Sequence, residues 1–208
     1  MKVLFTTLLI LMSSMAYGNQ KAITDTGDKV ILYSDGTWEY EEKADHKKGN
    51  SKSNSRSYRK SPDSTFLVKS TENNAGFWLD TDLWEYEKAT TNDDAEYEFK
   101  LKGEFLWAIA INETNQMSVE KLVDIAFDNA KSVAPDVKVV QKEYRTVNGS
   151  TVIYMEMVGT IEGTAFKYFG YYHSDESGTT QFLAFTDTEG SEFYQEEIND
   201  LLNGFTVR

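Results

Sequence analysis

The stretch 118–158 constrains the fold most, because it places an amphipathic helix directly before a hairpin. Ser118 is a typical N-cap and Pro135 stops a helix, so the sequence predicts a helix between them. The apolar residues of this helix recur at intervals of three and four, which predicts one buried face. That face comprises Val119, Leu122, Val123, Ala126, Phe127, Ala130 and Val133.

Two β-prone runs follow the helix on either side of Asn148 and Gly149. This dipeptide tolerates the positive φ that a two-residue hairpin turn needs, so the sequence predicts a hairpin whose return strand is 151–158. Further strands and a helix at 191–203 complete the pattern. The expected fold class is α+β, an antiparallel sheet with helices packed on it, preceded by an N-terminal β-hairpin.

The first 18 residues are predicted to be a cleaved secretory signal peptide. Lys2 precedes an apolar run of about ten residues, whereas a membrane-spanning helix needs about twenty. No other segment is apolar enough to span a membrane. The sequence has no cysteine, which excludes disulfides, thiolate metal sites and a lipoprotein anchor at the cleavage site. We therefore expect a periplasmic or secreted protein of a bacterial cell.

The rest of the chain divides into three parts. Residues 19–40 contain two β-prone runs around a Gly-containing turn and predict a hairpin module, with Trp38 and Tyr40 as its exposed adaptor residues. Residues 41–62 are rich in Lys, Ser, Asn and Gly and predict a flexible linker. Residues 63–208 supply the apolar content of the main domain.

Charge separates the linker from the main domain. Residues 63–208 carry 27 acidic and 11 basic residues, a net charge of −16, whereas 42–62 carry seven basic and two acidic residues, a net charge of +5. An acidic domain repels phosphates, so nucleic acid is not an expected partner. The basic linker is interpreted mainly as a solvated spacer.

Catalytic and metal-binding motifs are not found in the sequence. His46 lies in the predicted linker, and His173 closes a Tyr-rich strand near two acids. Acid pairs such as Asp80 with Asp82 are expected by chance in a chain with 34 acidic residues, so neither a metal nor another cofactor is predicted. An enzyme is not expected. The alternative is a metal-dependent envelope hydrolase that uses such carboxylates.

Aromatic residues are the remaining candidates for a binding surface. Trp78 and Trp84 precede the first hairpin of the main domain, and 168–172 form a Tyr-rich strand. Alternation gives this strand aromatic side chains on both faces, so most of them are expected in the core. Residues beside charged turns are less often fully buried. Trp78, Trp84 and Tyr172, with the adjacent His173, are therefore the expected ligand or partner surface.

Two stretches resemble known families. Residues 27–40 read Gly-Asp-Lys-Val-x-Leu-x-x-Asp-Gly-Thr-Trp-Glu-Tyr, which is similar to a short module near the start of many exported proteins of Bacteroidota. Residues 65–208 resemble the PsbP-like group, which includes bacterial DcrB-like exported proteins. That second resemblance rests on the order of elements and on Gly76-Phe77, Trp84, Asn129-Ala130-Lys131, Val147-Asn148-Gly149 and Gly170-Tyr171-Tyr172.

The PsbP-like resemblance implies an α/β/α sandwich around an antiparallel sheet and a history of binding proteins, with no family active site. The expected function is that of an exported, non-enzymatic binding or accessory protein of the bacterial envelope. Its partner is expected to be a protein or a small ligand, bound through the sheet face or an aromatic groove.

Overall fold

The computed structural model describes residues 20–24, 29–33, 37–40 and 52–208. The chain divides into a small N-terminal unit and a main unit that contains 52–208. The predicted signal peptide and the first part of the predicted linker, 41–51, lie outside the described residues.

The N-terminal unit is a three-stranded antiparallel sheet in the order β1-β2-β3. Its strands are β1 (Gln20–Ile23), β2 (Lys29–Leu32) and β3 (Trp38–Tyr40). The expected hairpin is β2–β3, with Leu32 opposite Trp38, and β1 adds a strand that the sequence pattern did not predict. Val30 is buried in this unit, whereas Trp38 is exposed.

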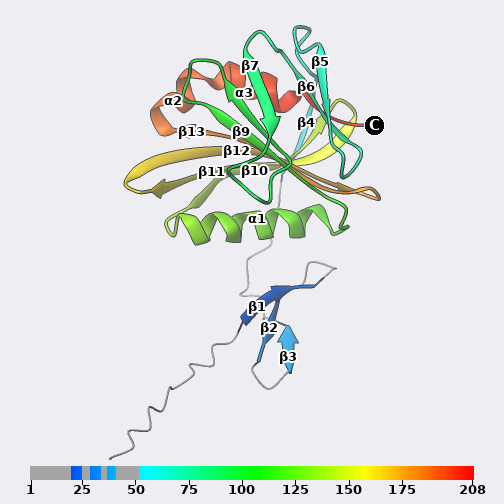
Figure 1. The fold of residues 1–208 in the computed structure, drawn as a ribbon, viewed down its shortest axis with the longest axis vertical. Helices are drawn as coiled ribbons and strands as arrows, with labels where there is room; N and C mark the ends of the chain where they lie inside the picture. Colours follow the sequence, from blue (N-terminus) through cyan, green and yellow to red (C-terminus); the bar gives the residue numbers. More distant parts are fainter. Residues whose placement is uncertain (1–19, 25–28, 34–36, 41–51) are drawn as a thin grey trace, which may run out of the picture. The chain divides into compact units, whose positions relative to one another are not determined.

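An eight-stranded sheet forms the centre of the main unit, in the order β4-β10-β11-β12-β13-β9-β8-β7 (Figure 1). Its pairs are antiparallel except for β4 with β10. The strands are β4 (Lys52–Tyr58), β7 (Trp84–Lys88), β8 (Tyr97–Leu101), β9 (Trp107–Glu113), β10 (Lys138–Val147), β11 (Ser150–Ile161), β12 (Thr164–Asp175) and β13 (Gly178–Asp187).

Helices cover both faces of this sheet. Helix α1 (Val119–Val133) packs on one face against β11 and β12. The other face is covered by α2 (Thr188–Phe193), α3 (Gln195–Asn203) and a small antiparallel sheet, β14-β6-β5. That sheet consists of β5 (Phe66–Lys69), β6 (Ala75–Leu79) and β14 (Phe205–Val207). This architecture confirms the predicted α+β fold class.

The helix and hairpin predicted from 118–158 are both present. The Ser118 side chain accepts a hydrogen bond from the N–H of Lys121 and caps α1, and Ala134 ends the helix before the proline. Asn148 and Gly149 have φ values of 48° and 90° in the β10–β11 turn, as the dipeptide requires. The predicted helix face packs against the core except at its last residue, because Phe127 is half-buried against the core cluster whereas Val133 is exposed.

The linker prediction is wrong for residues 52–62. Residues Lys52–Tyr58 form β4, which pairs in parallel with β10. The Asn54 side chain donates to Glu143, and the N–H of Asn148 donates to the carbonyl oxygen of Tyr58. A strand of polar residues has no apolar alternation of its own, so only its partner on β10 reveals it.

The C-terminal segment also differs from the prediction. One helix was expected from 191 to 203, but the chain forms α2 and α3 with a break at Tyr194. The N-cap is Asp187, whose carboxylate accepts a hydrogen bond from the N–H of Gly190. After α3 the chain adds β14 beside β6, a strand that the sequence analysis did not predict.

Candidate functional site: an acidic groove at Trp78

Of the four residues that were predicted to form one surface, the structure brings only Trp78 and Trp84 to the same groove. Trp84 is 3% exposed and Tyr172 is fully buried, so the prediction that they are exposed is wrong. Trp84 packs in the core cluster between the two sheets. Tyr172 alternates onto the opposite face of β12 and packs under α1. Trp78 and His173 remain partly accessible.

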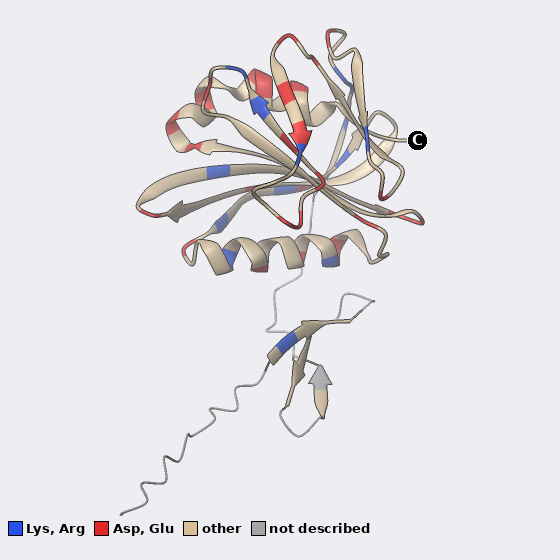
Figure 2. Cartoon of the chain, in the orientation of Figure 1, with Lys and Arg blue, Asp and Glu red and all other residues tan. Residues whose placement is uncertain are grey.

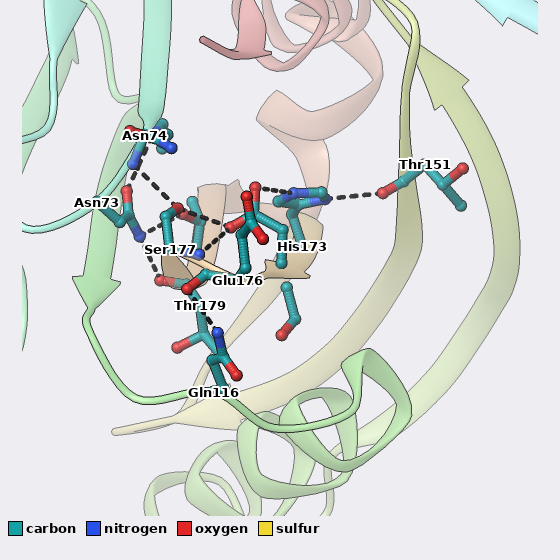
Figure 3. Close-up of polar contacts among 12 residues, drawn as sticks. Asn73, Asn74, Gln116, Thr151, His173, Glu176, Ser177 and Thr179 are labelled. Carbon is teal, nitrogen blue, oxygen red and sulfur yellow. Dashed lines mark hydrogen bonds and ion pairs between the residues drawn. The ribbon is translucent and has the colours of Figure 1, made fainter.

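His173 belongs to a polar network at the β12–β13 turn (Figure 3). Its Nδ1 lies 2.9 Å from the carbonyl oxygen of Thr151, and its Nε2 lies 3.3 Å from Oδ2 of Asp175. The Oδ1 atom of Asp175 accepts hydrogen bonds from the N–H and the hydroxyl of Ser177, at 2.7 and 2.6 Å. Although burial opposes it, this bonding from Ser177 lowers the pKa of the Asp175 carboxyl.

This network does not have the geometry of a nucleophile and its base. In a Ser-His-Asp triad the imidazole stands between the hydroxyl and the carboxylate and accepts the hydroxyl proton. Here Asp175 stands between Ser177 and His173, and both nitrogens of His173 already face acceptor oxygens. The backbone N–H of Asn74 donates to the Ser177 hydroxyl, so the network ties the β5–β6 turn to β12.

Trp78 borders a groove of the main unit. The Lys60 ammonium lies 4.9 Å from the centroid of the Trp78 ring and donates to the carbonyl oxygens of Ser61 and Ser64. These contacts hold the turn after β4 against β6. The turn thereby forms one wall of the groove.

The opposite wall is α3, which is held close to β6 by Gly204. The N–H of Trp78 donates to the carbonyl oxygen of Gly204 at 2.8 Å. A Cβ at position 204 would lie only 2.1 Å from the Trp78 carbonyl oxygen, so the close approach of the two segments requires glycine. This contact places the acidic first turn of α3 beside the β6–β7 loop.

The groove has a volume of about 280 Å³ and combines an apolar floor with an acidic rim. The accessible apolar surface comes from Trp78 and the exposed Leu83, above the buried Leu79, Trp84 and Leu201. Among the described residues that line the groove, five are acidic and none is basic. The lining consists of Ser61, Asp63, Ser64, Trp78, Leu79, Asp80, Leu83, Trp84, Glu196, Glu197, Asp200 and Leu201. Figure 2 shows the acidic residues of α2, α3 and β7 in the same region of the main unit.

The carboxylates of the groove lie close enough to act on one another. Desolvation raises the pKa of the Asp200 carboxyl, and the neighbouring charges of Glu196, Asp63, Glu197 and Asp80 raise it further. A carboxyl whose pKa is raised by like charges is stabilised when a cation enters its surroundings. The groove therefore favours positively charged groups.

The fold of the main unit is shared with a known structure. Cyanobacterial PsbP (CyanoP) from Synechocystis sp. PCC 6803 superposes with a TM-score of 0.54 at 11% sequence identity, and the match covers 69% of this chain and 92% of that chain. The main unit has a PsbP-like fold. LpqN of Mycobacterium tuberculosis, a protein involved in cell envelope biogenesis, matches the PsbP-like unit with a TM-score of 0.45 at 10% identity, over 68% of this chain and 89% of its own.

Sequence comparisons add no family to this fold. No family model matches the sequence, and no curated protein matches it. Among the described residues, no helix is long and apolar enough to cross a membrane.

The acids of the groove do not converge on one point. Within the described parts of the chain, no group of three or more His, Cys, Asp or Glu side chains is placed to hold a metal ion. The carboxylates instead line the rim of the PsbP-like unit around apolar side chains.

Trp78 was predicted from the sequence as a surface residue, whereas the acidic wall of the groove was not predicted. Asp200 lies four positions after Glu196 and three after Glu197, which places its side chain near both on one side of a helix. This spacing can be read from the sequence. The position of α3 opposite the β6–β7 loop cannot be read from it, because that position depends on the pairing of β14 with β6.

Proposed function

We propose that this chain is an exported binding or accessory protein whose PsbP-like unit binds a basic segment of a partner protein in the acidic groove, without catalysis. The predicted signal peptide supports export to the periplasm or exterior. The observation that carries the binding proposal is the set of five carboxylates around Trp78 and Leu83, with no basic residue among the described residues that line the groove.

Both components of the groove recognise the same kind of side chain. Lysine and arginine combine a long apolar stem with a cationic head. The stem packs on tryptophan and leucine surface, and the head reaches the rim carboxylates or the face of Trp78. Attraction between exposed charges weakens as salt rises, because the Debye length falls from about 10 Å at 0.1 M to about 3 Å at 1 M.

Calorimetric titration of the purified protein with short Lys- and Arg-rich peptides tests the proposal. We expect saturable binding that weakens with added salt, and no binding of a Glu-rich peptide of equal length. The double variant Glu197→Gln/Asp200→Asn keeps the side-chain shapes and removes two charges. Its affinity is expected to fall about three- to tenfold, because partly exposed charge pairs contribute up to about 1 kcal/mol each.

The matched control is Glu189→Gln/Glu192→Gln on α2. It removes the same net charge from exposed residues that do not line the groove. An equal loss of affinity in both double variants would show a general effect of net charge, and the groove would then not be the binding site.

A further inference from the structure

Strand β7 is an edge of the eight-stranded sheet. Within the described residues, Trp84–Lys88 pairs with β8 only, so its other side carries no neighbouring strand. An edge strand presents backbone N–H and C=O groups to which another extended chain can bond. The opposite edge of the sheet is β4, which is itself the strand added to β10.

Backbone hydrogen bonds alternate along β7 and show which of its residues direct their N–H and C=O groups away from β8. The N–H of Lys102 donates to the carbonyl oxygen of Leu83, and the N–H of Ala89 donates to that of Glu96. Residues 83, 85, 87 and 89 therefore direct their backbone groups to β8, because the direction alternates along an antiparallel strand. Tyr86 and Lys88 direct theirs to the open side.

The open edge begins beside the acidic groove. The N–H of Trp84 is already bonded to the carbonyl oxygen of Asp80 in the preceding turn, at 2.9 Å. Pairing with a new strand can thus start at the Trp84 carbonyl and continue through Lys88. Leu83 and Trp84 also line the groove, so a chain that leaves the groove meets this edge directly.

The side chains along β7 are suited to a basic strand. On one face, Glu85, Glu87 and Glu98 border a second hollow of about 310 Å³ that also contains Lys100 and Trp107. On the other face, Tyr86 is 39% exposed and its ring centroid lies 5.5 Å from that of Phe66, which is 43% exposed. An added strand would meet carboxylates on one face and aromatic rings on the other.

We infer that β7 receives an extended basic segment of the partner as an additional antiparallel strand. The inference rests on the proposed function in one respect, the basic character of the partner. The segment alternates lysine or arginine, facing Glu85 and Glu87, with apolar residues, facing Tyr86 and Phe66. A second copy of the chain is disfavoured, because pairing of two β7 strands would bring their carboxylates together.

The antiparallel arrangement fixes which amides of the segment bond to β7. A residue opposite Tyr86 or Lys88 exchanges both backbone hydrogen bonds with it and shares its face. The apolar residues of the segment thus point their N–H groups to β7, and the basic residues point theirs to solvent. N-methylation of an amide removes its donor and tests this assignment.

The test is calorimetric titration of the purified protein with a short peptide of alternating Lys and Val. One version is N-methylated at every Val and another at every Lys. We expect the Lys-methylated peptide to bind like the parent and the Val-methylated peptide to lose at least tenfold in affinity. Equal affinity of both methylated peptides, or no saturable binding of the parent, would overturn strand addition.

A protein variant provides the second arm. Lys88→Pro removes an outward N–H and leaves the bonds to β8 in place, and proline is tolerated on edge strands. It is expected to weaken binding of the parent peptide at least tenfold, whereas Lys88→Ala retains it. If Lys88→Pro binds normally while Glu197→Gln/Asp200→Asn binds weakly, strand addition fails and the groove function stands.

Discussion

The guanidinium carbon of Arg145 lies 3.5 Å from the centroid of the Tyr154 ring, inside the main unit. Arg145 is 9% exposed, and its Nε donates to the Glu143 carboxylate at 2.6 Å. The rings of Tyr58 and Tyr171 lie at 4.7 and 6.0 Å from the same carbon. Arg145, on β10, therefore contacts tyrosines of three other strands of the large sheet, β4, β11 and β12.

Replacing Arg145 is expected to be strongly destabilising. Arg145→Met keeps the apolar stem but leaves the half-buried Glu143 carboxylate without its cation, and breaking such a pair costs about 3 to 5 kcal/mol. Denaturant unfolding measures this loss. The control is Lys142→Met, whose ammonium lies 3.8 Å from the exposed Asp124 and which is expected to cost less than about 1 kcal/mol. Similar losses in both variants would contradict the role of Arg145.

The adjacent tyrosines 171 and 172 are expected to respond oppositely to loss of the hydroxyl. The Tyr171 hydroxyl donates to the Asn203 side chain at 2.8 Å, so Tyr171→Phe should destabilise by about 1 kcal/mol. The Tyr172 hydroxyl is buried and has no hydrogen-bond partner in the described residues. Tyr172→Phe should be neutral or stabilising, because an unsatisfied buried group costs about 1 to 3 kcal/mol. Thermal unfolding of both variants checks the pair.

Strand β4 is expected to protect its basic residues from protease. Tyr58 packs against the core of the main unit, and its carbonyl oxygen is bonded to the N–H of Asn148. Trypsin should therefore spare Arg56 and Arg59 in the native protein. Tyr58→Ala should expose both sites, whereas Ser57→Ala at an exposed position should not. Rapid native cleavage after Arg56 would show that β4 is not a stable strand.

The pH dependence of stability should have opposite signs at Asp200 and Asp136. Desolvation and neighbouring acids raise the pKa of Asp200, so its ionised form costs stability as pH rises through the folded pKa. Asp200→Asn should raise Tm at neutral pH, and the gain should vanish as pH falls towards about 4, the ordinary aspartate pKa.

Asp136 provides the control for this sign. Its carboxylate accepts hydrogen bonds from the N–H and the hydroxyl of Thr160, both at 2.8 Å, and these bonds lower the pKa of Asp136. Its stabilisation is present above the ordinary aspartate pKa and is lost as pH falls through the lowered value. Asp136→Asn should lower Tm at neutral pH. The same sign for both variants would contradict this electrostatic account.

Local patterns in the sequence determined several elements of the fold. Ser118 and the three- and four-residue apolar spacing specified α1, and Asn148 with Gly149 specified the β10–β11 turn. Such features depend on backbone conformation and on neighbours within a few residues. The α+β class follows from their order along the chain.

Only the tertiary structure decided which element packs against each face of a strand. β4 and β14 acquire their strand pairing from β10 and β6, residues far away in the sequence. Trp84 and Tyr172 are buried because a helix or a second sheet covers their faces, which alternation alone does not reveal. The acidic groove likewise exists only because α3 closes against the β6–β7 loop. Long-range packing, rather than any local pattern, brings its carboxylates and tryptophans together.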